Sequence, residues 1–529
     1  MGDRKGFHGG GQIFGREEDL LKLMMPNDEP EDIAVTLSNL NLKPEDEADL
    51  VTYGPLGQPF YTVNCPFVWT EYVTSESIEW RITDFEEKVE SDDMEWKAFC
   101  YSLYLAFLYA RLGKLSKALD QLEACEKRLQ ESSDDFYDEI MDGMTHSIEA
   151  SRAHIYFLKG DSETADDVIA KVFPLKDLNN PSKGALIALN AAVLQVFSRE
   201  CREMALKMMH TAIKLDPDEE GKRRGGWYYT VGKLMGQLRR MDHRVEIPSK
   251  EELKMLERST KVNPLAVSLA ALADAYREAI SSLRYDSTVQ VSEELSTKML
   301  SEAKELYQKA FELDSQNCAT LRRCGNGLMK LPHPYKDIVL AKKCLEKAIA
   351  VNPKSSSTYQ ALGTMEDRYN RNPRAALKYY ELAFENGNNI SAIFVLEARM
   401  KVNRNYNPLP DIDEYLETLA EVEDMAAEFA VLKGEYLFFQ RNDLLAAIKF
   451  WKEAILLKPN SEIVMKHMTR FITGRRINKP YLKSIPGRYV FNVYELLRYE
   501  IRNALRGPKL TGEEVNVLKE MAKLCESHG

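Results

Sequence analysis

A helix-length spacing of small and bulky residues recurs along this chain and constrains its fold more than any other feature. A small residue, a bulky residue four positions later and a second small residue three further on share one face of a helix. A proline five residues beyond them ends the helix. Four copies follow this spacing closely: Ala205, Met209, Ala212 and Pro217; Ala341, Leu345, Ala348 and Pro353; Ala447, Trp451, Ala454 and Pro459; and Ala303, Tyr307 and Ala310, with Ser315 in the proline position.

Three further segments keep parts of the same pattern. One has a first-helix signature at Tyr359, Leu362 and Gly363, followed by Ala376, Tyr380 and Ala383. The other two have an inter-helix glycine, Gly113 or Gly160, followed by a small residue five positions later. Seven copies in one chain predict an all-α fold, a tetratricopeptide-repeat α-solenoid of helix pairs over residues 77–475. Such a superhelix presents a concave surface, and binding is its usual function.

The segments on either side of the repeats have a different composition. Residues 1–72 form a leader rich in acids, Pro and Gly, which we expect to be largely irregular or disordered. Within it, residues 16–50 carry eleven acids and three bases, so most of the chain's net charge of −11 lies there. Residues 476–529 are expected to form a basic linker and two C-terminal capping helices.

Catalysis finds little support in the sequence. Phosphate-binding, dinucleotide-binding, zinc-protease and nucleophile-elbow motifs are all missing, so we expect a protein that is not an enzyme, with no catalytic residues, no cofactor and no metal. The eight cysteines have no C-x-x-C pair and are expected to be packed thiols. With no apolar run long enough to span a bilayer and no secretory signal, we expect a cytoplasmic protein that does not enter membranes.

Two basic segments stand out in this acidic chain. Residues 221–245 carry seven Lys or Arg and one acid, with aromatic residues interleaved, as in proteins that bind single-stranded nucleic acid. An equally weighted interpretation is a repeat helix with core aromatics and solvated cations. Residues 466–488 carry seven Lys or Arg and no acid, and are interpreted first as a linker. The RNA-binding candidates in the first segment are Lys222, Arg223, Arg224, Trp227, Lys233, Arg239 and Arg240.

Several segments resemble, in order and spacing, the family of interferon-induced proteins with tetratricopeptide repeats. They are IEWRITDFEEKV, AFLYARLGKLSKALDQLEACEKRLQ, ASRAHIYFLKGDSETADDVIAKVF, ALKMMHTAIKLDPD and GGWYYTVGKLMGQL, and the resemblance covers residues 77–400. A second resemblance, through Arg224 and residues 226–230, is to the tetratricopeptide repeat protein twenty-two type.

The first resemblance implies an innate immune, antiviral effector that holds the 5′ end of single-stranded RNA in a basic tunnel. The family's tunnel arginines match Arg81 and Lys233, and a later one falls near Arg322 or Arg323. The family's tunnel Gln is replaced by Phe85. Its stacking Trp and gripping Lys fall near Ala192 and Val196, which puts cap recognition in doubt.

Two functions therefore stay open on the sequence. One is an RNA-end binder with a basic groove. The other is a protein-interaction scaffold that takes partner peptides in its concave surface and binds no RNA. The acidic leader could be a second contact point or an intramolecular cover for a basic groove.

Overall fold

The computed structural model describes residues 64–68, single positions between 78 and 89, and 95–131, 135–197, 199–216, 225–241, 247–285, 292–313, 316–403, 405–472, 479–485, 488–507 and 510–528. The expectation for the leader of residues 1–72 therefore lies almost wholly outside the described residues. The contacts divide the chain into two compact units, residues 1–352 and 353–529.

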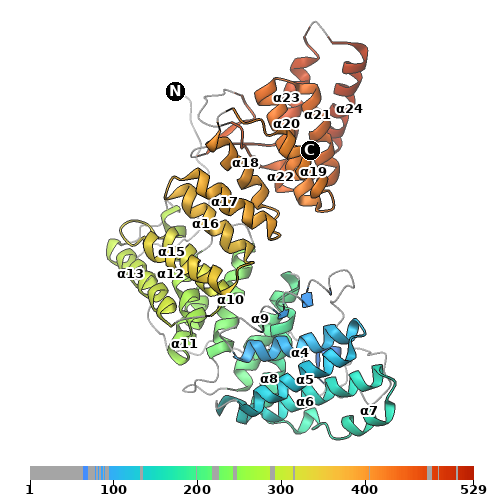
Figure 1. Cartoon of the computed structure of the whole chain (residues 1–529), viewed down its shortest axis with the longest axis vertical. Coiled ribbons are helices and arrows are strands. Elements are labelled where there is room, and N and C mark those ends of the chain that lie inside the picture. The colour runs from blue at the N-terminus through green and yellow to red at the C-terminus, as the bar shows by residue number, and fades with distance from the viewer. Residues whose placement is uncertain are drawn as a thin grey trace, which may run out of the picture. The chain divides into compact units, whose positions relative to one another are not determined.

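The first unit is built of consecutive helices that pack as antiparallel pairs (Figure 1). A single-turn 3-10 helix, Pro66–Val68, precedes them and packs against α4 and α6. The helices are α4 Glu95–Arg111, α5 Leu115–Glu131, α6 Asp135–Leu158, α7 Ser162–Ile169, α8 Asn180–Leu194, α9 Arg199–Leu215, α10 Gly225–Met241, α11 Lys250–Val262, α12 Ala266–Tyr285, α13 Glu293–Glu312, α14 Cys318–Lys330 and α15 Ile338–Val351, with a 3-10 turn at Leu175–Asp177.

The second unit is also built of helix pairs and includes a small sheet near its end. Its helices are α16 Ser356–Arg368, α17 Pro373–Glu385, α18 Ser391–Val402, α19 Leu409–Thr418, α20 Glu423–Arg441, α21 Leu444–Leu457, α22 Glu462–Met465, α23 Val493–Ala504 and α24 Gly512–His528. The last two match the helices expected at the C-terminus. The basic segment 466–488 contributes to a three-stranded antiparallel sheet of β1 His467–Met468, β2 Lys483–Ile485 and β3 Arg488–Phe491, in the order β1-β3-β2. No pattern in the sequence predicts these strands.

The repeated spacing works as the sequence predicts, because several of the bulky residues pack against a glycine of the partner helix. A Cβ placed on Gly363 would lie 2.5 Å from the Tyr380 ring, and one placed on Gly434 would lie 2.5 Å from Trp451 Nε1. Real Cβ atoms do not approach so closely, so only glycine lets these helices cross at this distance. The small residues of the pattern are completely buried: Ala205, Ala212, Ala303, Ala310, Ala341, Ala348, Ala376, Ala383, Ala447 and Ala454.

The turns between helices also follow the sequence signals. Gly113 and Gly160 adopt φ values of +71° and +84°, which side chains disfavour, and each reverses the chain between paired helices. Several helices begin with a side chain that accepts from the backbone N–H of the first turn, as at Asn317 and Asp337. The repeat architecture is therefore confirmed at the level of single residues.

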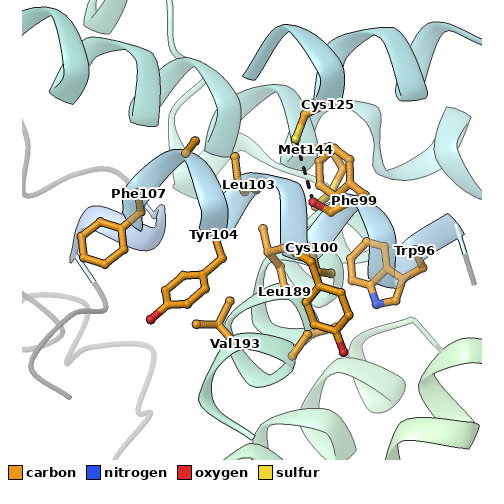
Figure 2. Packing of buried hydrophobic residues seen from close by; sticks show 14 of the residues in the cluster. Trp96, Phe99, Cys100, Leu103, Tyr104, Phe107, Cys125, Met144, Leu189 and Val193 are labelled. Atoms are coloured by element: carbon orange, nitrogen blue, oxygen red, sulfur yellow. Dashed lines mark hydrogen bonds between the residues drawn. The ribbon is translucent and has the colours of Figure 1, made fainter. Parts of the chain in front are cut away.

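Helix α4 of the first unit is buried on all sides from Trp96 to Ala110. A helix with no solvent face has to lie inside a ring of other elements. Figure 2 shows its side chains directed toward Cys125 of α5 on one side and toward Leu189 and Val193 of α8 on the other. The Cys125 thiol lies 3.9 Å from the Phe99 carbonyl oxygen, which accepts its weak hydrogen bond.

The thiol expectation is confirmed, because all eight cysteines are buried and unbridged. No helix among the described residues is long and apolar enough to cross a membrane. The same residues hold no group of three or more His, Cys, Asp or Glu side chains placed to bind a metal ion.

Candidate nucleic-acid interface

The aromatic residues of the first basic segment lie in the core. Trp227, Tyr228 and Tyr229 of α10 are each at most 2% exposed. The Trp227 ring meets the Trp96 ring at 6.0 Å between centroids. The prediction that Trp227 is a stacking platform for a base is wrong, because a buried indole has no face to offer. Lys222, Arg223 and Arg224 lie outside the described residues.

Arg239 and Arg240, at the end of α10, are held by carboxylates. The Arg239 guanidinium donates to both oxygens of Glu252 at 3.0 Å and to Glu278 at 2.8 Å, and its side chain is only 10% exposed. Arg240 donates to the same Glu278 at 3.0 Å and is 46% exposed. Burial alone would raise the pKa of Glu278, but Arg240, Arg239 and Arg277 outweigh it and hold that pKa below its usual value. Arg239 is thus a structural residue, while Arg240 keeps an accessible side.

Two candidates meet at the C-terminal end of α8. Lys233 donates to Gln195 Oε1 at 3.4 Å, and the Arg81 guanidinium lies 4.6 Å over the Phe197 ring. The end of a helix carries partial negative charge, so these cations also stabilise α8. Ala192 and Val196, near which the resemblance places the family's stacking Trp and gripping Lys, are apolar: Ala192 is buried, and Val196 packs against the core. Arg81 and Lys233 therefore each contact a residue at or just beyond the end of α8, and Ala192 and Val196 offer no aromatic platform.

Arg322 and Arg323 lie next to each other on α14, within a cluster that draws residues from several helices. We call Lys97, Tyr229, Asp274, Arg277, Arg322 and Arg323 the inner cluster. Arg323 Nε lies 3.3 Å from Asp274 Oδ2, and Asp274 also accepts from Arg277 at 3.1 Å. On the other side, Lys97 Nζ lies 4.0 Å over the Tyr229 ring. Tyr229 is in turn a hydrogen-bond partner of Arg323.

Tyr307, on the second helix of a repeat pair, holds Asp274 and Arg277 of the inner cluster in position. The Tyr307 hydroxyl of α13 donates to Asp274 at 2.6 Å and accepts from Arg277 at 3.4 Å, and the ring is completely buried. Burial raises the pKa of Tyr307 well above its usual value, and the Asp274 charge adds to this effect. The phenol is therefore a permanent donor to Asp274, which orients that carboxylate between Arg277 and Arg323.

Arg322 differs from its neighbours because it has no carboxylate partner within the part of the chain that the structure describes. It is half-buried, and burial lowers the pKa of its guanidinium, with repulsion from Arg323 adding to that effect. An arginine stays charged at neutral pH even so. A partly desolvated cation beside a like charge is costly, and an anion placed there would lower that cost.

Charges around the cluster do not balance. Four arginines, 239, 240, 277 and 323, are connected through three carboxylates: Glu252, Asp274 and Glu278. Arg322 lies beside Arg323 and pairs with none of these carboxylates, so the five arginines and three carboxylates together carry two positive charges in excess, in a protein with a net charge of −11. This local excess makes the inner cluster a candidate anion-binding site.

The residues that complete the site were not identified from the sequence. Lys97, Tyr229, Asp274 and Arg277 belong to α4, α10 and α12, and no motif links them. A weak signal exists in the i, i+3 spacing of Asp274 and Arg277 on α12, which places an acid and a base next to each other on the helix surface.

Comparisons with solved structures support the fold. The human IFIT1 dimer with m7Gppp-AAAA superposes with a TM-score of 0.55 at 15% identity, covering 88% of this chain and 95% of that chain. The human IFIT1 dimer with PPP-AAAA gives a TM-score of 0.52 at 14% identity, covering 89% and 95%. An IFIT1 monomeric mutant with Gppp-AAAA gives 0.56 at 14% identity, covering 89% and 99%.

These similarities confirm the tetratricopeptide-repeat α-solenoid, and they confirm at the level of the fold the resemblance to interferon-induced proteins with tetratricopeptide repeats. No protein-family model matches the chain, and no curated protein matches it by sequence.

Proposed function

We propose that this protein binds the 5′ end of single-stranded RNA through the inner cluster and acts as an antiviral effector of innate immunity in the cytoplasm. The observation that carries the proposal is Arg322, a half-buried cation beside Arg323 with no carboxylate partner among the described residues. The chain shares its fold with IFIT1, which was solved with m7Gppp-AAAA and with PPP-AAAA. A phosphate group supplies the anion that the cluster lacks.

The proposed mechanism is phosphate capture by preoriented arginines. Asp274 and Tyr307 hold Arg323 and Arg277 in fixed positions, so their guanidinium groups lose little conformational freedom when a phosphate arrives. Arg322 supplies an uncompensated charge, and Arg240 and Lys233 extend the positive surface along α10. Specificity for a base is not expected from Trp227, since its ring lies in the core.

Binding measurements test this proposal. Single-stranded RNA with a 5′-triphosphate and the same RNA with a 5′-hydroxyl are titrated at low and at moderate salt. We expect a preference for the triphosphate that weakens with salt, because each phosphate contact releases a counterion. Arg322→Gln should reduce the affinity by roughly 10-fold, the value of one hydrogen-bonded charge pair. Lys342→Gln is the matched control, because Lys342 is an exposed cation on α15 that pairs with Glu346 of the same helix.

A second function, a protein-docking scaffold without RNA binding, is favoured by one observation. Much of the arginine charge is already neutralised by Glu252, Asp274 and Glu278. A surface with both charges suits the binding of a polar peptide. Absence of RNA binding at low salt, in a folded protein, would leave this alternative.

A further inference from the structure

A short segment, residues 64–68, packs against two helices of the first unit, and we call it the strap. Its 3-10 turn contacts both α4 and α6. Cys65 of the strap is completely buried. The Phe67 ring stacks on the His154 ring of α6, with 5.0 Å between the centroids, and meets the Phe107 ring of α4 edge-on at 5.2 Å. The strap therefore covers part of the surface that α4 and α6 share.

One hydrogen bond of the strap depends on the protonation state of a histidine. The backbone N–H of Asn64 donates to His146 Nε2 of α6 at 2.9 Å, and His146 Nδ1 lies 2.6 Å from the Phe173 carbonyl oxygen. A ring nitrogen that accepts carries no hydrogen, and one that faces a carbonyl oxygen has to donate. His146 is therefore neutral, with its proton on Nδ1. A second proton, on Nε2, would face the Asn64 N–H, so the charged imidazole cannot keep this contact.

The surroundings of both histidines also disfavour a positive charge. His146 is 1% exposed, and burial lowers its pKa, although the Phe173 carbonyl acts in the opposite direction. Burial alone holds the pKa of His154 down at about 4. No carboxylate in the described parts of α4, α5, α7 or α8 contributes to the pKa of either ring.

The charged groups on the adjoining elements pair with one another instead. Arg152 of α6 lies 2.6 Å from Glu126 of α5 and 3.6 Å from Glu149 of its own helix. Burial raises the pKa of Glu149, while Arg152 and Lys171 act against that rise. Glu149 is thus the carboxyl group of these elements that has to be controlled for when the pH is lowered.

We propose that the strap is an acid-sensitive contact: neutral His146 holds residues 64–68 against α6, and proton uptake by His146 releases them. The strap covers His146 Nε2 through Asn64 and one face of the His154 ring through Phe67. Release gives both rings access to water, where an imidazole regains its ordinary pKa of about 6.5. The inference concerns the strap alone and does not depend on RNA binding.

The size of the effect follows from proton linkage. Both histidines have a lower pKa in the closed state than in the released state, so acid favours release at pH values below about 6.5. One histidine that is neutral when the strap is closed raises the released fraction about 10-fold between pH 7.5 and 5.5. His146 and His154 together would raise it by up to about 100-fold.

Cys65 supplies the readout, because its thiol is buried and can react only when the strap is released. The full chain is treated with dithiodipyridine, which modifies thiols in acid as well as at neutral pH, and the modified cysteines are identified by peptide mass spectrometry. Each rate is divided by that of N-acetylcysteine at the same pH. Cys125 is the internal reference, since this buried thiol between α4 and α5 reacts only if the repeats themselves open. We expect the rate at Cys65, relative to Cys125, to rise between about 10-fold and 100-fold from pH 7.5 to 5.5.

The variant His146→Gln tests the assignment to one ring. Its amide oxygen can accept from the Asn64 N–H but does not titrate, so the pH response should shrink by about 10-fold whatever the starting rate. His210→Gln, a partly exposed histidine of α9 beside Glu251, and Glu149→Gln are the controls, and both should respond as the parent does.

Two results would overturn the proposal. One is a Cys65 rate that changes with pH only in step with the Cys125 rate, because the thiol would then report global unfolding. The other is a pH response in His146→Gln as large as in the parent chain, including the case in which Glu149→Gln abolishes the response.

Discussion

Gly327 of α14 packs against Tyr307, a residue that belongs both to the repeat core and, through its hydrogen bond to Asp274, to the site. A Cβ at this position would overlap Cζ and Oη of Tyr307 and lie 2.6 Å from its Cε1. The ring is completely buried, so it has no open side to move into. A ring that did move would give up the 2.6 Å hydrogen bond to Asp274.

The cost of Gly327→Ala can be estimated from these contacts. Overpacking a buried ring costs about 1 to 3 kcal/mol, and losing the Tyr307 hydrogen bond to the Asp274 carboxylate, which keeps Arg277 and Arg323, costs about 1.5 to 3 kcal/mol. Replacing glycine within a helix returns about 1 kcal/mol. We therefore expect Gly327→Ala to lower the free energy of unfolding by about 1.5 to 5 kcal/mol.

The assay is denaturant unfolding followed by circular dichroism, with the double variant Tyr307→Leu/Gly327→Ala as the test of mechanism. Leucine occupies the same repeat position at Leu345, so the double variant should be less destabilised than the sum of the two single variants. Gly512→Ala is the control, because a Cβ there meets nothing within 4 Å. Additive single effects, or a Gly327→Ala chain as stable as the parent, would refute the packing argument.

Three other perturbations have defined outcomes. Burial holds the pKa of His154 down at about 4 and also lowers that of His146. Below pH 6.5 the unfolded chain therefore binds protons that the native chain does not, so the free energy of unfolding should fall as the pH drops from 6.5 toward 4. His154 should account for about 3 kcal/mol of this fall. Unfolding measured as a function of pH should therefore show a shallower fall in His154→Leu. Glu252→Gln should cost about 2 kcal/mol in chemical unfolding, because buried Arg239 loses one of its two carboxylate partners and keeps only Glu278. The exposed neighbour Glu251→Gln should change stability by less than about 0.5 kcal/mol, and equal effects would contradict this. Trp227→Phe should lower the thermal midpoint yet leave the RNA affinity of the folded protein unchanged, and a large affinity loss would restore the stacking hypothesis.

The helix pairs could be predicted from the sequence because their information is local. A small residue, a bulky residue and a second small residue within eight positions specify one helix face, and the structure buries Ala341, Leu345 and Ala348 together. Where a glycine faces the bulky residue, it lies on the neighbouring helix and is also close in sequence, as in Gly363 and Tyr380.

The site could not be predicted in the same way because its residues are far apart along the chain. Lys97 and Arg323 contact the same Tyr229 side chain from helices more than two hundred residues apart in sequence. Small deviations in helical phase accumulate over that distance, so no spacing rule places them together.

In the basic segment 221–245 the sequence pattern suggested a binding surface where the structure has a buried core. Its interleaved aromatics indicate a stacking surface, but α10 buries Trp227, Tyr228 and Tyr229 in succession. Three consecutive residues can all be buried only where a helix is covered on most of its circumference, and composition carries no information on that. The strands at 467–491 escape prediction because they are only two to four residues long.

The most direct test of the account is the affinity of the purified full chain and of its Arg322→Gln variant for 5′-triphosphate single-stranded RNA at low salt, with Lys342→Gln beside them. We predict binding that falls by roughly 10-fold in Arg322→Gln and is unchanged in Lys342→Gln. Equal affinities in all three proteins would contradict the assignment of the inner cluster as the RNA phosphate site.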